Sequence, residues 1–142
     1  MTTTLSAPSP GKAVLPFNLA DLQTAAAERF GLSPRSTYET AVALYERGLI
    51  TYPKTEIRHL VDIQFEEASK LVRQYVMASS AKGYDASLKG PAFDTDKVGS
   101  HHGIIPTLIP AAALFGGAPW SEAEVQVYQL VHEQFLALFR VV

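Results

Sequence analysis

Two stretches of helical spacing, separated by only a few residues, constrain the fold of this chain most strongly. Apolar residues recur every three or four positions from Leu19 to Phe30, Asn18 can cap their start, and Gly31 ends the run. A second stretch follows, where residues 36–39 match a capping box and Gly48 is the expected stop. Two helices joined by so short a turn are typical of a helix-turn-helix.

The second helix is followed at once by a β-favouring run, Leu49 to Tyr52, which Pro53 ends. Helix, turn, helix and extended segment is the element order of a winged helix. A small helical bundle explains the same pattern equally well, so both alternatives stay open. In either case we predict a mainly α fold with short β segments, α+β at most, around a helix-turn-helix or winged-helix-like core.

The rest of the chain predicts two further helices. Asp62 is expected to cap a third helix, and residues 78–99 then lose all periodicity and predict a mobile connection. Residues 103–107 predict a short buried extended piece. Residues 121–124 form another capping box, and we expect the helix that starts there to continue to Val142. A chain that stops inside an apolar helix suggests truncation.

Size and composition fit one domain of 142 residues with 47% hydrophobic content. Residues 1–14 read as a flexible leader or a cloning remnant, which leaves 15–142 as the domain. A net charge of -2 lacks the basic excess of a stand-alone DNA binder. There is no cysteine for a disulfide or thiolate site, and no apolar run approaches the roughly 18 residues that span a bilayer.

Tyr52 is a candidate nucleophile on chemical grounds. A free phenol has a pKa of about 10, so its oxygen attacks only if the proton is lost or the charge is stabilised. In an extended segment Lys54 would point the same way as Tyr52 and could place a cation beside the attacked group. The alternative, a structural tyrosine packed under the second helix, is favoured by spacing alone.

The His101-His102 pair is the second chemical candidate. Adjacent residues of an extended segment face opposite ways, so the two rings are poor joint ligands for one metal ion. One of them could instead donate a hydrogen bond to a phosphate oxygen, although a merely solvated loop histidine is favoured by the pattern alone. The acidic residues Asp94, Asp96, Glu66 and Glu67 read as structural, so we predict no metal site in this chain.

Three ordered motifs favour the functional alternatives. Pro16 to Gln23 resembles the PF…LQ opening of the active-site domain of type IA DNA topoisomerases. Ala41 to Thr55 resembles the A-x-x-LYE-x-GLITYPRT signature of that family, whose tyrosine is the nucleophile. His101 to Thr107 is similar to the HHAIIPT motif, with the His-His pair of the topoisomerase III branch. The resemblance runs from Leu15 to the final helix.

This resemblance implies a mechanism. Tyr52 would attack single-stranded DNA and form a 5′-phosphotyrosine intermediate, so strands pass, in relaxation or decatenation, without ATP. Lys54 occupies the place of an arginine that steadies the phosphate, and His101 the place of a histidine that contacts it. Arg35, Arg58 and His102 are the candidate DNA contacts. The implied partners are single-stranded DNA and the remaining domains of a parent topoisomerase, with no membrane, in a bacterial cytoplasm, nucleoid- or plasmid-associated.

Departures from the family pattern qualify this implication. Lys54 replaces a planar bidentate arginine, and Gly103 replaces the usual alanine. No cofactor is expected in this chain, because the acidic domain that holds Mg²⁺ in the full enzyme is missing from it. We therefore expect the isolated chain to bind DNA weakly and hardly to cleave it. Two other hypotheses stay open: a non-enzymatic winged-helix module that keeps the signature, and a helical interaction domain with Tyr52 buried away from His101.

Overall fold

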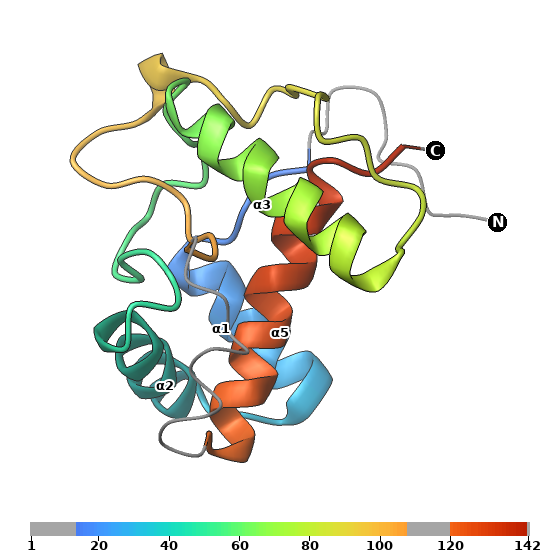
Figure 1. Cartoon of the computed structure of the whole chain (residues 1–142). Coiled ribbons are helices and arrows are strands. Elements are labelled where there is room, and N and C mark those ends of the chain that lie inside the picture. Colours follow the sequence, from blue (N-terminus) through green and yellow to red (C-terminus); the bar gives the residue numbers. More distant parts are fainter. Residues whose placement is uncertain (1–13, 108–119, 142) are drawn as a thin grey trace, which may run out of the picture.

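The computed structural model describes residues 14–107 and 120–141, which form a mainly helical fold (Figure 1). The elements are α1 (Leu19–Phe30), α2 (Pro34–Glu46), α3 (Gln64–Ser79), the 3₁₀ turn η1 (Thr95–Lys97) and α5 (Glu122–Ala137). Within the described ranges, extended segments meet only as isolated bridges, namely Phe17–Ile104, Ile50–Pro106, Leu60–Phe93 and Tyr84–Arg140. The predicted mainly α fold with short β segments is confirmed. The predicted leader lies, except for Val14, outside the described residues.

The caps of α1 are the predicted ones, whereas α2 begins earlier than expected. Asn18 caps α1 by accepting a hydrogen bond of 2.8 Å from the Asp21 N–H, and Gly31 ends the helix with φ 70°. The prediction that α2 starts at Ser36 is wrong. Ser33 caps the helix, its hydroxyl accepting from the Ser36 N–H at 3.1 Å. Pro34 fits the first helical position because that position needs no N–H partner and proline presets φ.

The start of α3 corrects a second prediction. Asp62 does not cap the helix, which has Ile63 at the N-cap position and no side-chain cap there. The Asp62 N–H donates instead to the Thr95 hydroxyl at 2.8 Å. The Gln64 side chain turns back, and its carbonyl oxygen accepts from the Val61 N–H at 2.8 Å. A glutamine in the first turn therefore satisfies a backbone donor ahead of the helix.

The final helix starts as predicted but ends sooner. Both hydrogen bonds of the capping box are present at Ser121 and Glu124. The prediction of a helix running to Val142 is wrong, because α5 ends at Ala137. Beyond it the backbone pairs with the segment before Ser87: the Phe139 carbonyl accepts from the Asp85 N–H at 2.8 Å, and the Val141 N–H donates to Gly83 at 2.7 Å.

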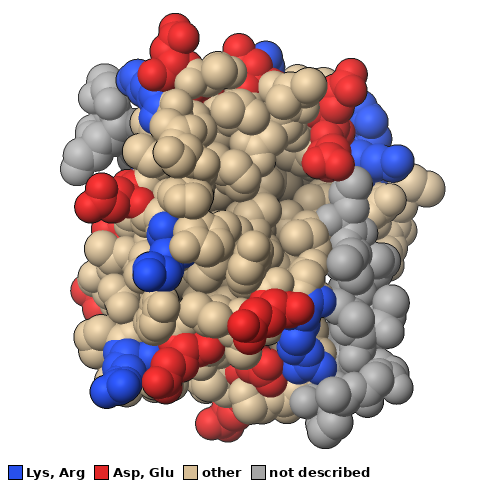
Figure 2. Space-filling view, turned by 90° about the vertical axis from the view of Figure 1, so that its left-hand side faces the viewer, with Lys and Arg blue, Asp and Glu red and all other residues tan. Residues whose placement is uncertain are grey.

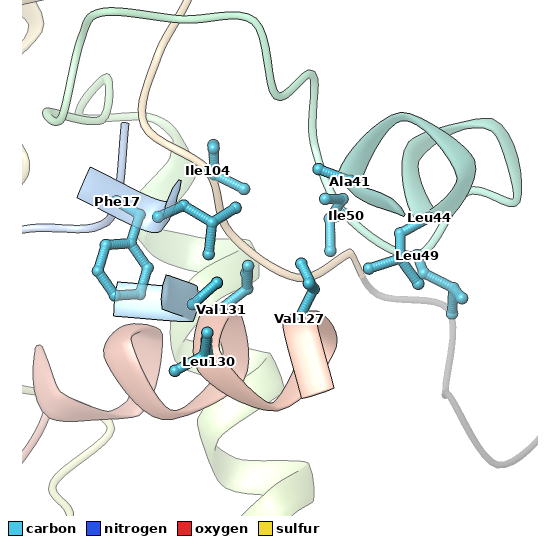
Figure 3. Packing of buried hydrophobic residues seen from close by; sticks show 11 residues of the cluster. Phe17, Ala41, Leu44, Leu49, Ile50, Ile104, Val127, Leu130 and Val131 are labelled. Carbon is cyan, nitrogen blue, oxygen red and sulfur yellow. The ribbon is translucent and has the colours of Figure 1, made fainter. Parts of the chain in front are cut away.

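Two hydrophobic clusters hold the fold together, and α5 contributes to both. The first joins α1, α2, the N-terminal half of α5 and two extended segments, with Ile50 and Ile104 directed toward Val127 and Val131 (Figure 3). The second lies where α3 crosses the C-terminal half of α5 (Figure 1). Its buried members are Leu60, Ala68, Val72, Ala92, Phe93, Ile105, Phe135, Leu136, Leu138 and Phe139.

The connection between α3 and the extended piece at 103–107 is anchored to this second cluster. Apart from η1 it has no helix, as its composition predicts, but Ala92 and Phe93 are buried, which the sequence pattern did not reveal. The Leu60 N–H donates to the Ala92 carbonyl at 2.9 Å, and the Asp94 N–H donates back to Leu60 at 2.8 Å. None of the described helices is long and apolar enough to cross a membrane.

Candidate active site

Tyr52 lies at the end of a segment whose position is fixed on both sides. At the end of α2 the Gly48 N–H bonds to Tyr45 at 2.9 Å and the Leu49 N–H to Leu44 at 2.9 Å, the two bonds of a Schellman motif. Gly48 has φ 78°, the left-handed conformation that this motif requires and that glycine adopts without strain. The chain therefore leaves α2 in one defined direction, toward Tyr52.

The segment then pairs with the predicted extended piece at 103–107, which is buried at Gly103, Ile104, Ile105 and Pro106 as expected. The Thr51 N–H donates to the Ile105 carbonyl at 2.9 Å, and the Thr107 N–H donates to the Leu49 carbonyl at 3.0 Å. The Ile105 N–H donates in turn to the Thr51 hydroxyl at 3.0 Å. This pairing brings two segments about fifty residues apart into contact, and it carries Tyr52 and His101 on its two sides.

Tyr52 and His101 meet ring against ring. Their centroids are 4.6 Å apart with the planes tilted by 30°. Tyr52 also contacts Tyr45 edge to face, with centroids 5.4 Å apart. The Tyr52 side chain is 36% exposed and His101 is exposed, so solvent or a ligand can reach the pair. The hypothesis of a Tyr52 side chain buried away from His101 is therefore wrong.

His102 points elsewhere, as expected for neighbouring residues of an extended segment. It is half-buried, with Nδ1 2.8 Å from the Gly103 carbonyl oxygen and Nε2 3.2 Å from Nε2 of Gln64 on α3. A carbonyl oxygen can only accept, so Nδ1 carries the proton. Nε2 is then the acceptor for the Gln64 amide. The two histidines thus have different surroundings, one beside Tyr52 and the other bound within the protein.

Lys54 lies on the exposed side of the same segment as Tyr52. Burial alternates from residue 52 to residue 56, with Tyr52, Lys54 and Glu56 exposed and Pro53 and Thr55 buried. The Thr55 N–H donates to the Pro53 carbonyl at 2.9 Å, so the backbone turns tightly at Lys54. The chain continues along the start of α1, where an open hollow of about 480 Å³ is lined by Asn18, Leu19, Ala20, Gln23, Lys54, Thr55 and Glu56.

The two candidate arginines make other contacts. Arg58 donates to the backbone carbonyls of Pro16 at 2.8 Å and Leu15 at 3.2 Å, and pairs with Asp21 at 3.3 Å. It ties the first described residues to the segment after Tyr52. Arg35 lies in the first turn of α2, highly exposed, with Glu39 at 3.3 Å. In the part of the chain that the structure describes, no hydrogen bond or ring contact joins either arginine to Tyr52 or His101.

The charges around these segments are mixed. The face that carries residues 50–60 and 98–107 is largely uncharged at its centre, with acidic and basic side chains scattered round the edge (Figure 2). Burial lowers the pKa of His59, with a further lowering by Lys97 and Arg58 and an opposing effect of Asp94. In its neutral form this imidazole adds no positive charge. The visible face therefore offers single cations and no extended basic patch.

The acidic residues lie at the starts of two helical elements. Asp94 caps η1 by accepting from the Asp96 N–H at 3.2 Å, and Glu66 and Glu67 lie in the first turn of α3. Across residues 14–107 and 120–141 no three His, Asp or Glu side chains come together as a possible metal site. The Mg²⁺ ion that the motifs imply therefore finds no fitting ligand set among these residues.

A larger hollow of about 830 Å³ lies between α1 and α5. Its lining includes Arg29, Tyr75, His132 and Glu133 but none of the candidate site residues. Two of these lining residues, Arg29 and Glu133, form an ion pair at 2.6 Å. The Tyr52 region therefore stays the candidate site, because the candidate nucleophile and its imidazole neighbour do not line the larger hollow.

Sequence reasoning missed two residues that hold the site. Thr51 uses both its backbone and its hydroxyl to bind the extended piece. Gln64 binds His102 from the first position of α3. Thr51 stands inside the Tyr52 motif, so its neighbour could have drawn attention to it. Nothing in the spacing of Gln64 marks it, because its partner is 38 residues away.

Comparison with known proteins identifies the class. The model of the DNA topoisomerase family matches residues 4–141, nearly the whole chain, so the chain belongs to this family. Its relatives include DNA topoisomerase 3 of Vibrio cholerae, with 35% identity over 133 residues, and that of Salmonella typhimurium, with 36% over 137 residues; each match covers 89% of this chain. DNA topoisomerase 3 of Staphylococcus epidermidis is 34% identical over 128 residues, 84% of this chain. The chain spans 17–20% of the length of these relatives. The resemblance found in the three motifs is confirmed.

Proposed function

We propose that this chain is the tyrosine-bearing domain of a type IA topoisomerase and that Tyr52 is its nucleophile. In the proposed reaction the phenol oxygen attacks a backbone phosphorus of single-stranded DNA and loses its proton. A new O–P bond joins the tyrosine to the 5′ phosphate at the break, and the 3′ oxygen of the other strand end leaves as a hydroxyl, taking up a proton. The reverse attack reseals the strand. One phosphodiester replaces another, so no ATP is required.

The observation that carries this proposal is the contact between the Tyr52 and His101 rings. Each residue belongs to a separate family-like motif, and nothing local in the sequence requires the two to meet. In the fold the centroids of their rings are 4.6 Å apart on an accessible surface, where a phosphate could lie against both. An imidazole N–H at this place would donate to a phosphate oxygen and stabilise the charge that develops during attack.

Lys54 has the second role in the proposal. Its ammonium is exposed two residues from the nucleophile and would contribute a single mobile charge to the phosphate. Arg35, Arg58 and His102 remain proposed DNA contacts. For Arg58 and His102 such a contact would compete with the backbone carbonyls, carboxylate and amide that already bind them.

The remaining parts of the reaction belong to the longer relatives. Mg²⁺ would be held by residues outside those described, and we assign no step to it. The near-neutral charge and the uncharged centre of the visible face favour a division in which most DNA affinity comes from other domains (Figure 2). Strand passage during relaxation or decatenation, in a bacterial cytoplasm, is part of the same proposal.

The test uses a chimera of the Vibrio cholerae enzyme in which this chain replaces the matching segment. The chimera is incubated with a single-stranded oligonucleotide labelled at its 3′ end or its 5′ end, and denatured. A covalent adduct carrying only the 3′-end label is expected, because that fragment holds the 5′ phosphate. Tyr52→Phe should abolish the adduct, since only the hydroxyl is lost.

Tyr45→Phe is the matched control, because this exposed neighbour packs against the Tyr52 ring and is not the nucleophile. It should retain the adduct. An adduct that persists in Tyr52→Phe would refute the assignment. A folded, DNA-binding chimera that never forms an adduct would favour the non-enzymatic module instead.

A further inference from the structure

A continuous series of hydrogen bonds connects α3 with the residue beside Tyr52. It begins at the Val61 N–H, which donates to the Gln64 side-chain carbonyl at 2.8 Å. The orientation of the Gln64 amide is thereby fixed, and its NH₂ group faces Nε2 of His102 at 3.2 Å. Because an NH₂ group only donates, Nε2 of His102 must be unprotonated.

The second half of the series runs through Gly103. With Nε2 unprotonated, the neutral ring carries its proton on Nδ1 and donates to the Gly103 carbonyl at 2.8 Å. The same carbonyl accepts from the Thr51 hydroxyl at 3.4 Å. Thr51 is the residue before Tyr52, and Gly103 is two residues after His101. The series therefore ends on both segments that carry the ring pair.

The backbone leaves Gly103 little freedom to move independently of this series. Its N–H donates to the His59 carbonyl at 2.9 Å, and the space where a side chain would begin is filled by the Arg58 carbonyl oxygen. The turn that presents His101 is thus held by the backbone on one side and by His102 on the other. His102 in turn depends on Gln64 for its tautomer and its position.

We propose that Gln64 is a positioning residue of the cleavage site, acting through the tautomer of His102 to hold His101 against Tyr52. The bonds themselves do not depend on the chemistry, but their importance for cleavage rests on the proposed function. Gln64 touches neither the nucleophile nor the histidine beside it. Its effect comes from fixing the one arrangement in which the Gly103 carbonyl accepts from both His102 and Thr51.

The first test is nuclear magnetic resonance of the whole chain with ¹⁵N-labelled histidine. The His102 ring should carry its proton on Nδ1 near neutral pH. A ring protonated on Nε2 would overturn the proposal, because the Gln64 amide could not then donate to it.

The second test is Gln64→Glu. A carboxylate facing Nε2 should raise the proton affinity of the His102 ring about tenfold or more, because an opposite charge in contact favours the charged form. Gln74→Glu makes the same change at an exposed position of α3 and should leave His102 unaltered. Equal His102 spectra in the two variants would refute the contact.

The third test is Gln64→Met, which keeps the length of the side chain but cannot donate. The nuclear Overhauser signals between the Tyr52 and His101 rings should weaken, whereas Gln74→Met should preserve them. In the chimera, Gln64→Met should lower the rate of adduct formation about tenfold, in line with the sensitivity of reactions to small misplacements. Unchanged ring signals and an unchanged rate in a folded Gln64→Met variant would overturn the proposal. If the Tyr52→Phe chimera forms the adduct as well as the unchanged chimera, the proposed function is refuted. The spectra would still report the hydrogen bonds of Gln64 and His102.

Discussion

Gly103→Ala is the substitution whose outcome the geometry defines most closely. A methyl group built on Gly103 would meet the Arg58 carbonyl oxygen at 2.6 Å and Cβ of Pro16 at 2.9 Å. Both distances are shorter than real side chains show. Neither neighbour is the end of a flexible side chain, so the backbone has to move. The family motif that this segment resembles has alanine at this position.

The magnitude follows from the cost of overpacking. Forcing a methyl group into filled space costs about 1–3 kcal/mol. Replacing glycine by alanine also restricts the unfolded chain, which offsets the cost by about 0.4–1 kcal/mol. The net loss of unfolding free energy is therefore between about 0 and 2.6 kcal/mol, which corresponds to a fall in Tm of up to roughly 10 °C for a chain of this size.

Gly99→Ala is the matched control. A methyl group there meets nothing within 4 Å, and the unfolded-state effect is the same. The difference between the two variants in urea-induced unfolding should thus report the contact alone, about 1–3 kcal/mol. If the two variants are equally stable, the backbone at Gly103 yields without cost, and the reasoning about its confinement fails.

Two further predictions concern charge. Lys54→Arg in the chimera should preserve or raise the rate of adduct formation. Lys54→Ala should lower this rate, on the order of a hundredfold if the charge acts in the transition state. An undiminished rate for Lys54→Ala would remove Lys54 from the mechanism. Burial lowers the folded-state pKa of His132 below its ordinary 6.5, an effect that Glu133 partly opposes. As the pH falls, the unfolded chain therefore takes up this proton first. The contribution of His132 to the free energy of unfolding is fully present above pH 6.5 and is lost as the pH falls toward the folded-state pKa. Urea titrations at several pH values should show that the free energy of unfolding falls less steeply with falling pH in His132→Phe than in the unchanged chain. His59, whose pKa is also lowered, contributes to the decline that remains. Equal declines in the two proteins would contradict the burial argument.

The helix ends that are fixed by short-range hydrogen bonds could be predicted from the sequence. The caps at Asn18 and Ser121 and the stop at Gly48 involve partners within a few residues, so their patterns are visible in the chain. The start of α2 was misplaced because two serines three residues apart each have capping chemistry, and Pro34 after the first one decides between them. The end of α5 was misplaced because the residues after it, Phe139 and Val141, bind a distant segment near Gly83.

The sequence named the residues of the candidate site but did not show how the fold brings them together. Spacing alone could not distinguish Tyr52 from a structural tyrosine, and only the resemblance of three ordered motifs predicted that His101 belongs with it. The contacts that make them neighbours span long sequence separations, as in the pairing of Thr51 with Ile105. Periodicity shows which residues of a segment are buried, but it does not show which distant segment covers them.

The participation of α5 in both hydrophobic clusters has a consequence for synthesis on the ribosome. Val127 and Val131 complete one cluster, and Phe135 and Phe139 complete the other. This helix follows every other described element in the sequence. Neither cluster can close until residues 122–139 have left the exit tunnel, so the parts of α1, α2 and α3 that pack against α5 wait uncovered. At about 5–20 residues per second that wait lasts several seconds, an interval in which a chaperone can bind the nascent chain.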